Sequence, residues 1–344
     1  MRKTIQKALF FVLAITLLTT PMMVRAAEPI TPTGISILEI GTHVDELVAN
    51  HIQASSPSPG VAVAIIKNGE IVFMQGYGYA NIEQQILIDP ATTIFAHASV
   101  NKLFVYVSAM QLVEQGLLDL DEDINEYLPE DVAQKFSFQF SFTMRDLLNH
   151  SAGFGEVTFD GTQDAENVRI RRNLQEGLLA TQPKQIFEPG TAKAYSNFGN
   201  ALAAYIVSQI SGMEYADFER SNIFEPLGMT NTRSQPHWFG DSTFQQNRAR
   251  TYQPDGSGGF NRFHWSYLAT YPQGGSIGTV ADLAQFAIAL MPEQGDASPL
   301  FDSRSTLDLM FSPSYDNPNV LRGTHHGFLT HAAGSYTAFA HGSF

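Results

Sequence analysis

One stretch of hydrophobic positions dominates the pattern of this chain. Between Leu103 and Val113 nearly every position is apolar, and only Ser108 and Gln111 interrupt the run. A helix that is apolar on all sides belongs inside a domain, because no face of it favours water. The pattern therefore predicts a buried helix that ends near Gly116.

The chain before this helix shows two further patterns. An amphipathic pattern over residues 37–53 predicts a helix. Residues 60–80 form two strand-like runs on either side of Asn68-Gly69, a dipeptide that strongly favours a two-residue hairpin. The hairpin indicates an antiparallel sheet.

The chain after the buried helix is mainly helical from residue 117 to residue 279, with many loops. One helix is expected to end at Gly212, another to run from Thr279 to Leu290, and a strand-like YTAFAHGSF closes the chain. We therefore predict an α/β (α+β) fold, in which an antiparallel sheet flanked by helices is interrupted by a mainly helical lobe. The junction of the two parts is the expected cleft.

The first residues have the features of a secretory signal peptide. Arg2, Lys3 and Lys7 precede an apolar run over residues 8–18, which is too short to cross a bilayer comfortably. The small-residue pattern at residues 24–26 predicts cleavage after Ala26. We therefore expect residues 1–26 to be a signal peptide and the product to be secreted or periplasmic.

Residues 27–344 are long enough for one large domain. The chain has no cysteine, which excludes disulfides and a lipid-anchored cysteine. Its formal net charge of −14 argues against nucleic acid and anionic membrane surfaces as partners, although such a charge also simply favours solubility. No second apolar span follows the leader, so we expect no stable membrane insertion after cleavage.

Ser99 and Lys102 stand at the start of the buried helix, three residues apart and therefore on one face. A serine with a lysine in reach supplies a nucleophile and a base, provided that burial and the helix N-terminus make the lysine a proton acceptor. The alternative is a serine N-cap with a lysine whose head reaches water. A capping box, however, has Glu or Gln at the third position, and a lysine there opposes the helix dipole.

Ser276 is a competing nucleophile. Residues 274–278 read GGSIG, a formal match to the G-x-S-x-G nucleophile elbow. That motif follows a buried strand in a series of βαβ units, whereas Pro272 disfavours such a strand here. We interpret Ser276 as a residue of a glycine-rich loop.

Three short motifs in order, Ser99-Val100-Asn101-Lys102, Tyr195-Ser196-Asn197 and His341-Gly342, resemble those of the serine β-lactamase and penicillin-binding protein superfamily. The class C-like branch, which also holds esterases and D-amino-acid peptidases, is the most similar. The resemblance extends to TMRDLLNHSAG, FEPGTAKAYSNFGNALAAYIV and GGSIGTVADLAQF, and so covers most of residues 27–344.

This resemblance implies a role for each motif residue. Ser99 would attack the carbonyl carbon and form an acyl-enzyme. Lys102 would keep Tyr195 phenolate-like, so that Tyr195 takes the serine proton and later activates the deacylating water. Asn197 would bind Lys102 or the substrate amide. His341, Gly342 and Ser343 would bind substrate.

The third motif departs from the Lys-Thr-Gly that is usual in β-lactamases. His341 stands in place of the lysine, and an imidazole that is neutral near pH 7 is a weaker anchor for a carboxylate. Efficient β-lactam hydrolysis is therefore less expected than ester or peptide hydrolysis. Ser343 also departs from the glycine of related sequences.

The resemblance also implies further strands and a helix after the third motif, together with an oxyanion donor shortly after His341. The sequence ends at Phe344, so we expect a domain that is truncated at its C-terminus, and either a fragment or an impaired activity.

The function expected from the sequence is that of an exported serine hydrolase acting on small esters, amides or D-amino-acid-containing peptides, and residues 240–275 are expected to form an irregular lobe facing the substrate. The alternatives are a class C-like β-lactamase and a catalytically impaired, penicillin-binding-like sensor. His325, His326 and His331 lack the carboxylate-backed spacing of a metal site, so we expect neither a metal nor another cofactor.

Overall fold

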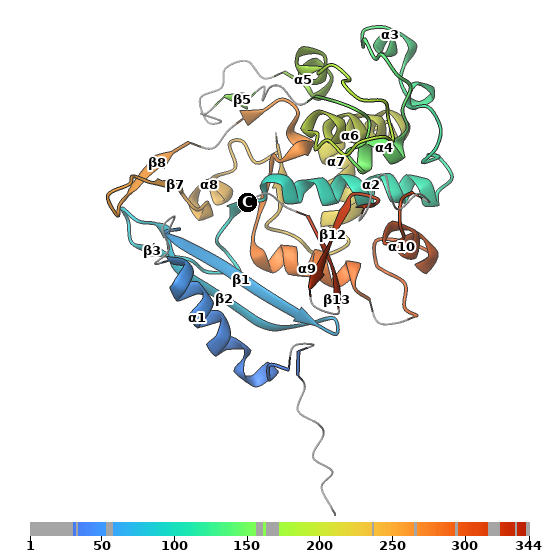
Figure 1. Cartoon of the computed structure of the whole chain (residues 1–344). Coiled ribbons are helices and arrows are strands. Elements are labelled where there is room, and N and C mark those ends of the chain that lie inside the picture. Colours follow the sequence, from blue (N-terminus) through green and yellow to red (C-terminus); the bar gives the residue numbers. More distant parts are fainter. Residues whose placement is uncertain are drawn as a thin grey trace, which may run out of the picture.

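The computed structural model describes residues 30–31, 34–52, 58–155, 161–162, 172–235, 237–264, 267–292, 295–315, 324–333 and 336–341 (Figure 1). The expected signal peptide, Gly342 and Ser343 lie outside the described residues.

Helices make up most of the middle of the chain. They are α1 Ile40–Ile52, α2 Lys102–Glu114, α3 Glu130–Ala133, α4 Met144–Leu148, α5 Leu174–Thr181, α6 Asn197–Ser211, α7 Tyr215–Glu219, α8 Ser242–Asn247, α9 Val280–Leu290 and α10 Arg304–Met310. Single helical turns are η1 Ile37–Glu39, η2 Ala98–Asn101, η3 Ile124–Tyr127, η4 Arg220–Phe224 and η5 Tyr271–Gln273.

The strands are short except for the first two. They are β1 Gly60–Lys67, β2 Glu70–Asn81, β3 Ile86–Leu87, β4 Phe95–Ala96, β5 Gly161–Thr162, β6 Arg233–Ser234, β7 Thr251–Pro254, β8 Phe260–Phe263, β9 Tyr267–Leu268, β10 Ser276–Gly278, β11 Thr324–His325, β12 Phe328–Ala333 and β13 Tyr336–Ala340.

The predicted N-terminal hairpin is confirmed. Strands β1 and β2 pair antiparallel, with Lys67 opposite Glu70 across the turn. Asn68 (φ 51°) and Gly69 (φ 75°) are both left-handed, as a tight hairpin turn with the twist of the flanking strands requires. Helices α1 and α9 pack on this hairpin (Figure 1).

Helix α2 crosses the middle of the molecule, as its hydrophobic pattern predicted (Figure 1). Its apolar side chains from Phe104 to Leu112 are at most 1% exposed. Helices α6, α7 and α10 pack against it. Burial of this helix on every side fixes the position of the turn at its N-terminus, where Ser99 lies.

The strands do not form one continuous sheet within the described residues. They form three antiparallel three-stranded sheets, β1-β2-β3, β4-β10-β6 and β11-β12-β13, and two pairs. The second sheet is built from segments far apart in sequence, and it holds the chain before Ser99 against the chain around Ser276. No helix among the described residues is long and apolar enough to cross a membrane.

Two expectations need correction. The lobe over residues 240–275 is more regular than predicted, because β7 and β8 form an antiparallel hairpin within it. The closing strand is shorter than its sequence pattern, since β13 ends at Ala340 and His341 follows it. The helices expected before Gly212 and from Thr279 are confirmed, with Gly212 left-handed (φ 69°) and Thr279 as the N-cap.

Candidate active site

Ser99 lies in η2, the single turn that leads into α2. It is not the N-cap of the helix, because Asn101 occupies that position and makes no capping bond with its side chain. The Asn101 side chain instead accepts a hydrogen bond from the Ser276 N–H (2.7 Å) and donates one to the Pro272 carbonyl (2.9 Å). These two bonds join the turn of the serine to the segment before β10.

Lys102 is fully buried at the first position of α2. Its ammonium donates to Ser99 Oγ (3.2 Å), Asn197 Oδ1 (2.8 Å) and the Gln273 carbonyl (2.6 Å). An ammonium has three protons, and these acceptors match all three. Such pairing offsets the cost of burying the cation, and it aims one proton at Ser99.

Tyr195 and Asn197 flank the start of α6. Ser196 between them is the N-cap, and its side chain accepts a hydrogen bond from the Gly199 N–H (2.9 Å). The cap places Tyr195 outside the helix and Asn197 in its first turn. Both side chains therefore reach Lys102, Asn197 through its oxygen and Tyr195 through its ring, whose centroid lies 4.9 Å from the ammonium.

Three predicted site residues thus meet at one oxygen atom. The Tyr195 hydroxyl donates to Ser99 Oγ over 2.6 Å, and the Lys102 ammonium donates to it over 3.2 Å. Tyr195 is 40% exposed and Ser99 is half-buried, whereas Lys102 is fully buried. A substrate can therefore reach the serine from the side of Tyr195, while the cation stays out of water.

His341 follows β13 and lies across from Tyr195, with the two ring centroids 6.4 Å apart. Its Nε2 lies 3.2 Å from the Tyr106 hydroxyl. Burial lowers the pKa of His341 to about 4, and the positive charges of Lys102 and Lys193 act in the same direction. The imidazole is consequently neutral at pH 7.

Ser276 has a different environment from the one that its motif suggested. It lies within strand β10 rather than in a loop, and it is fully buried. Its hydroxyl is 3.0 Å from His97 Nδ1, and burial lowers the pKa of His97 to about 3. The interpretation of Ser276 as a loop residue is therefore wrong, and its side chain is buried from solvent.

Sequence reasoning missed four groups around Ser99: the Gln273 carbonyl, the Asn101 side chain, Tyr106 and His150. Tyr106 hydrogen-bonds both His150 (3.3 Å) and His341 (3.2 Å). His150 also packs against Tyr195, with ring centroids 4.5 Å apart. Tyr106 counts as hydrophobic in the run of α2, and its hydroxyl was the one local signal for this cluster.

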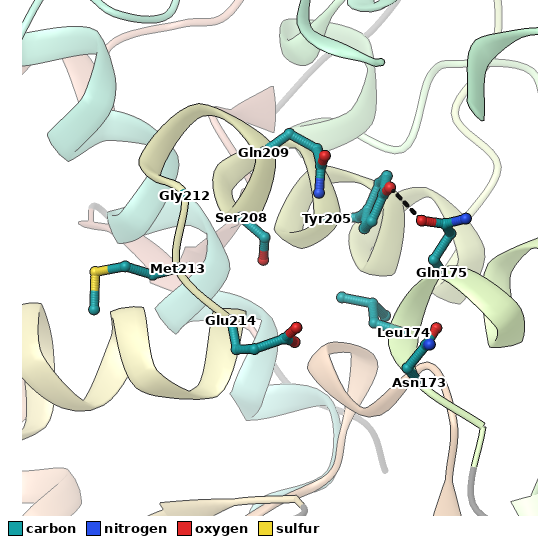
Figure 2. Close-up of a pocket in the computed structure, with 9 residues that line it drawn as sticks. All are labelled: Asn173, Leu174, Gln175, Tyr205, Ser208, Gln209, Gly212, Met213 and Glu214. Carbon is teal, nitrogen blue, oxygen red and sulfur yellow. Dashed lines mark hydrogen bonds between the residues drawn. The ribbon is translucent and has the colours of Figure 1, made fainter. Parts of the chain in front are cut away.

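Two pockets bear on the site, one beside the turn that holds Ser99 and one remote from it. A cavity of about 200 Å³ next to the serine turn is lined by Ala98, Trp238, Phe263 and Ile277 among others. A second, of about 380 Å³, lies at the far end of α6, where the Tyr205 hydroxyl donates to Gln175 (2.9 Å) (Figure 2). Among the described residues no three His, Cys, Asp or Glu side chains are grouped as metal ligands.

A family model described as Beta-lactamase matches residues 44–344. Penicillin-binding protein 4* of Bacillus subtilis (strain 168) is 31% identical over 173 residues, which are 50% of this chain and 37% of that protein. The chain thus spans little more than a third of the length of this curated relative.

Solved structures agree with this match. D-amino acid amidase from Ochrobactrum anthropi SV3 is 26% identical with a TM-score of 0.63, covering 88% of this chain and 84% of that one. Beta-lactamase/D-alanine carboxypeptidase from Yersinia pestis has the same fold, with a TM-score of 0.64 at 20% identity over 87% of this chain and 83% of that one. The chain has a β-lactamase/transpeptidase-like fold and belongs to the family of serine β-lactamases and penicillin-binding proteins.

Proposed function

We propose that the protein is an exported serine hydrolase that forms an acyl-enzyme on Ser99 and hydrolyses small esters or amides, including those of D-amino acids. The observation that carries the proposal is the meeting of Tyr195 OH (2.6 Å) and Lys102 Nζ (3.2 Å) at Ser99 Oγ. A nucleophile with a base in hydrogen-bond reach, and a third group that orients the base, is the arrangement of nucleophilic catalysis.

Tyr195 carries the protons in both halves of the proposed reaction. Ser99 Oγ attacks the carbonyl carbon while the phenol oxygen of Tyr195, in its ionised form, takes the serine proton. The nearby ammonium of Lys102 favours that ionised oxygen electrostatically. Tyr195 then gives the proton to the departing alcohol or amine. In the second half of the reaction it takes a proton from the water that attacks the acyl-enzyme and returns it to Ser99 Oγ as the acyl–oxygen bond breaks.

The backbone N–H of Ser99 is a donor for the oxyanion that forms during attack. The second donor expected from the sequence, after His341, belongs to residues 342–344, which lie outside the described residues.

The surroundings of Ser99 favour an uncharged substrate with an apolar acyl group. The cavity beside Ala98 is lined mainly by apolar side chains, among them Trp238 and Phe263. His341 is neutral at pH 7 because burial lowers its pKa to about 4, so it offers no positive charge to a carboxylate. The similarity to a D-amino acid amidase supports amides of apolar D-amino acids within this class.

Export rests on the leader pattern alone, with its basic start and short apolar run. N-terminal sequencing of the protein recovered from the extracellular or periplasmic fraction tests it. A mature N-terminus at Ala27 is expected, and an intact Met1 would contradict export.

The nucleophile is tested by reaction with a fluorophosphonate probe, followed by peptide mapping by mass spectrometry. We expect the label on Ser99. The Ser99→Ala variant should lose it, and the matched Ser276→Ala variant should keep it. A label on Ser276, or equal labelling of both variants, would contradict the proposal.

Turnover of the unlabelled enzyme is measured with p-nitrophenyl acetate and with D- and L-phenylalanine amide. Multiple turnovers of the ester support a hydrolase. A single turnover followed by a stable adduct would instead indicate a penicillin-binding-like sensor, and rapid hydrolysis of a β-lactam would indicate a β-lactamase.

A further inference from the structure

A chain of hydrogen bonds runs behind the catalytic residues and links the segment of Tyr195 to His341. The Ser196 N–H donates to His150 Nδ1 (3.1 Å), His150 Nε2 lies 3.3 Å from the Tyr106 hydroxyl, and that hydroxyl lies 3.2 Å from His341 Nε2. Nothing in the reaction described above uses Tyr106 or His150.

The Ser196 N–H fixes the direction of the hydrogen bond between His150 and Tyr106. A backbone N–H can only donate, so His150 Nδ1 is an acceptor. A neutral imidazole with an accepting Nδ1 carries its proton on Nε2, and that proton goes to the Tyr106 oxygen. The Tyr106 hydroxyl has one proton and lies 3.2 Å from His341 Nε2. When that proton points to His341, Nε2 is the acceptor and the proton of His341 is on Nδ1. This is the direction that we assign and test below.

The protonation states that this requires agree with the burial of the three groups. Burial holds the pKa of His150 well below its usual range and lowers that of His341 to about 4, with Lys102 and Lys193 adding their repulsion to both. Burial raises the pKa of Tyr106 well above its usual range. At pH 7 both histidines are neutral and Tyr106 keeps its proton.

His150, the first side chain of this hydrogen-bond network, has an unusual backbone conformation. Its φ of +58° is left-handed, a region that residues other than glycine occupy at a cost of about 1 kcal/mol or more. The segment of Tyr195 holds it on two sides, because the Ala194 N–H donates to the His150 carbonyl (2.8 Å) and Ser196 to its ring. The neighbouring structure therefore keeps a strained residue beside the Tyr195 ring.

The other end of the hydrogen-bond network lies beside the backbone of Ser99, which raises the pKa of His341 against the effect of burial. The Tyr106 ring lies directly over Gly327, where a side-chain carbon would come within 2.2 Å of it. Tyr106 is thus packed in one position, with its hydroxyl between the two histidines.

We propose that Tyr106 and His150 are positioning residues that hold His341 in its Nδ1–H tautomer and fix Tyr195 relative to Ser99. The proposal rests on the hydrolase function proposed above. It attributes the tautomer of His341 to the Ser196 N–H, to which His341 is linked through His150 and Tyr106.

Nuclear magnetic resonance of the protein labelled with ¹⁵N in its histidines tests the tautomer directly. We expect the His341 signals, identified by their loss in His341→Asn, to show a protonated Nδ1 and an unprotonated Nε2 at pH 7. A protonated Nε2 in the unchanged protein would overturn the proposal. This readout does not depend on turnover, so it stands even if Ser99 fails to react with the fluorophosphonate probe, which would overturn the proposed function alone.

The variant Tyr106→Phe removes the hydroxyl and keeps the ring over Gly327. We expect a mixture of His341 tautomers and a kcat lower by about tenfold, as for the loss of one buried hydrogen bond in the transition state. The control is Tyr205→Phe, which removes a hydroxyl that donates to Gln175 (Figure 2). Tyr205 lies eight residues after Asn197 on α6, which is about 12 Å along the helix. This variant should leave both the tautomer and kcat unchanged.

Three other outcomes of these measurements would overturn the proposal. An unchanged His341 tautomer in Tyr106→Phe would overturn the assigned direction of the bonds. A changed tautomer with an unchanged kcat would overturn the positioning role. Loss of kcat in Tyr205→Phe to the same degree would show that the effect is general to buried tyrosines and would also overturn it.

Discussion

Two serines of this protein each have a possible base in hydrogen-bond reach, and only one of them has the rest of a catalytic site. Ser99 Oγ lies 2.6 Å from Tyr195 and 3.2 Å from Lys102, and Ser276 Oγ lies 3.0 Å from His97. By distance alone the two sites are equivalent.

They differ in access and in the state of the base. Ser99 is half-buried beside a tyrosine that is 40% exposed, whereas Ser276 and His97 are at most 5% exposed. Burial lowers the pKa of His97 to about 3, so it is a poor proton acceptor at pH 7. The comparison shows that a serine and a base in contact need an opening for substrate and a third, orienting group before they indicate catalysis.

The largest expected effect comes from removing Tyr195, the base, or Lys102, the cation that favours its ionised form. Lys102→Ala and Tyr195→Phe should each lower ester turnover by about 10²–10⁴, because proton transfer from Ser99 is lost. His97→Gln, the matched change at the other serine, should leave turnover near that of the unchanged enzyme. Rates are compared for variants whose circular dichroism is native. Near-normal turnover in both Lys102→Ala and Tyr195→Phe would contradict the mechanism.

A smaller effect is expected from Asn101, which connects the two serine regions. Asn101→Ala leaves the Ser276 N–H and the Pro272 carbonyl without their partner, at a cost of about 1–3 kcal/mol in the free energy of unfolding. The exposed Asn125→Ala should change it by less than about 0.5 kcal/mol. Urea unfolding measures both, and equal stabilities would show that Asn101 does not hold the two regions together.

The smallest effect concerns pH. The pKa of His97 is lowered to about 3 in the folded protein, so between that value and its usual 6.5 the unfolded chain binds a proton that the folded chain does not. Stability is therefore present above pH 6.5 and is lost as the pH falls. Between pH 7 and pH 5.5 this residue should account for about 1 kcal/mol.

The variant His97→Gln isolates this contribution, because it removes the titrating group. His150 and His341 have lowered pKa values of the same sign, so the variant should keep part of the loss in acid. Urea unfolding at the two pH values is the measurement. An identical acid loss with and without His97 would mean that its proton affinity is the same in both states.

Local signals in the sequence were enough to predict several elements. The apolar run from Leu103 to Val113 predicted a helix buried on all sides, and Asn68-Gly69 predicted the hairpin, since both patterns act between neighbours in the chain. Ser99 and Lys102 were found in the same way, because residues three apart on a helix share a face.

The remaining contacts of the site join distant segments, and no local pattern encodes them. Lys102 and Gln273 are 171 positions apart, and Tyr106 and His341 are 235 apart. Tyr195 and Asn197 were assigned through the motif resemblance rather than through any periodicity. At Ser276 a local pattern was present but misleading, because the match to G-x-S-x-G carries no information on whether the serine is buried.

The bond from Lys102 to residue 273 is made to a main-chain carbonyl, so it does not depend on which side chain position 273 carries. Replacement of the buried Gln273 side chain would report on its hydrogen bond to Thr270 and not on the main-chain carbonyl, which supplies an acceptor to the buried cation. Replacement of the following amide by an ester, which weakens the carbonyl as an acceptor, would expose its contribution. The position of this acceptor is therefore set by the path of the backbone. A comparison of residue identities among relatives would not detect it.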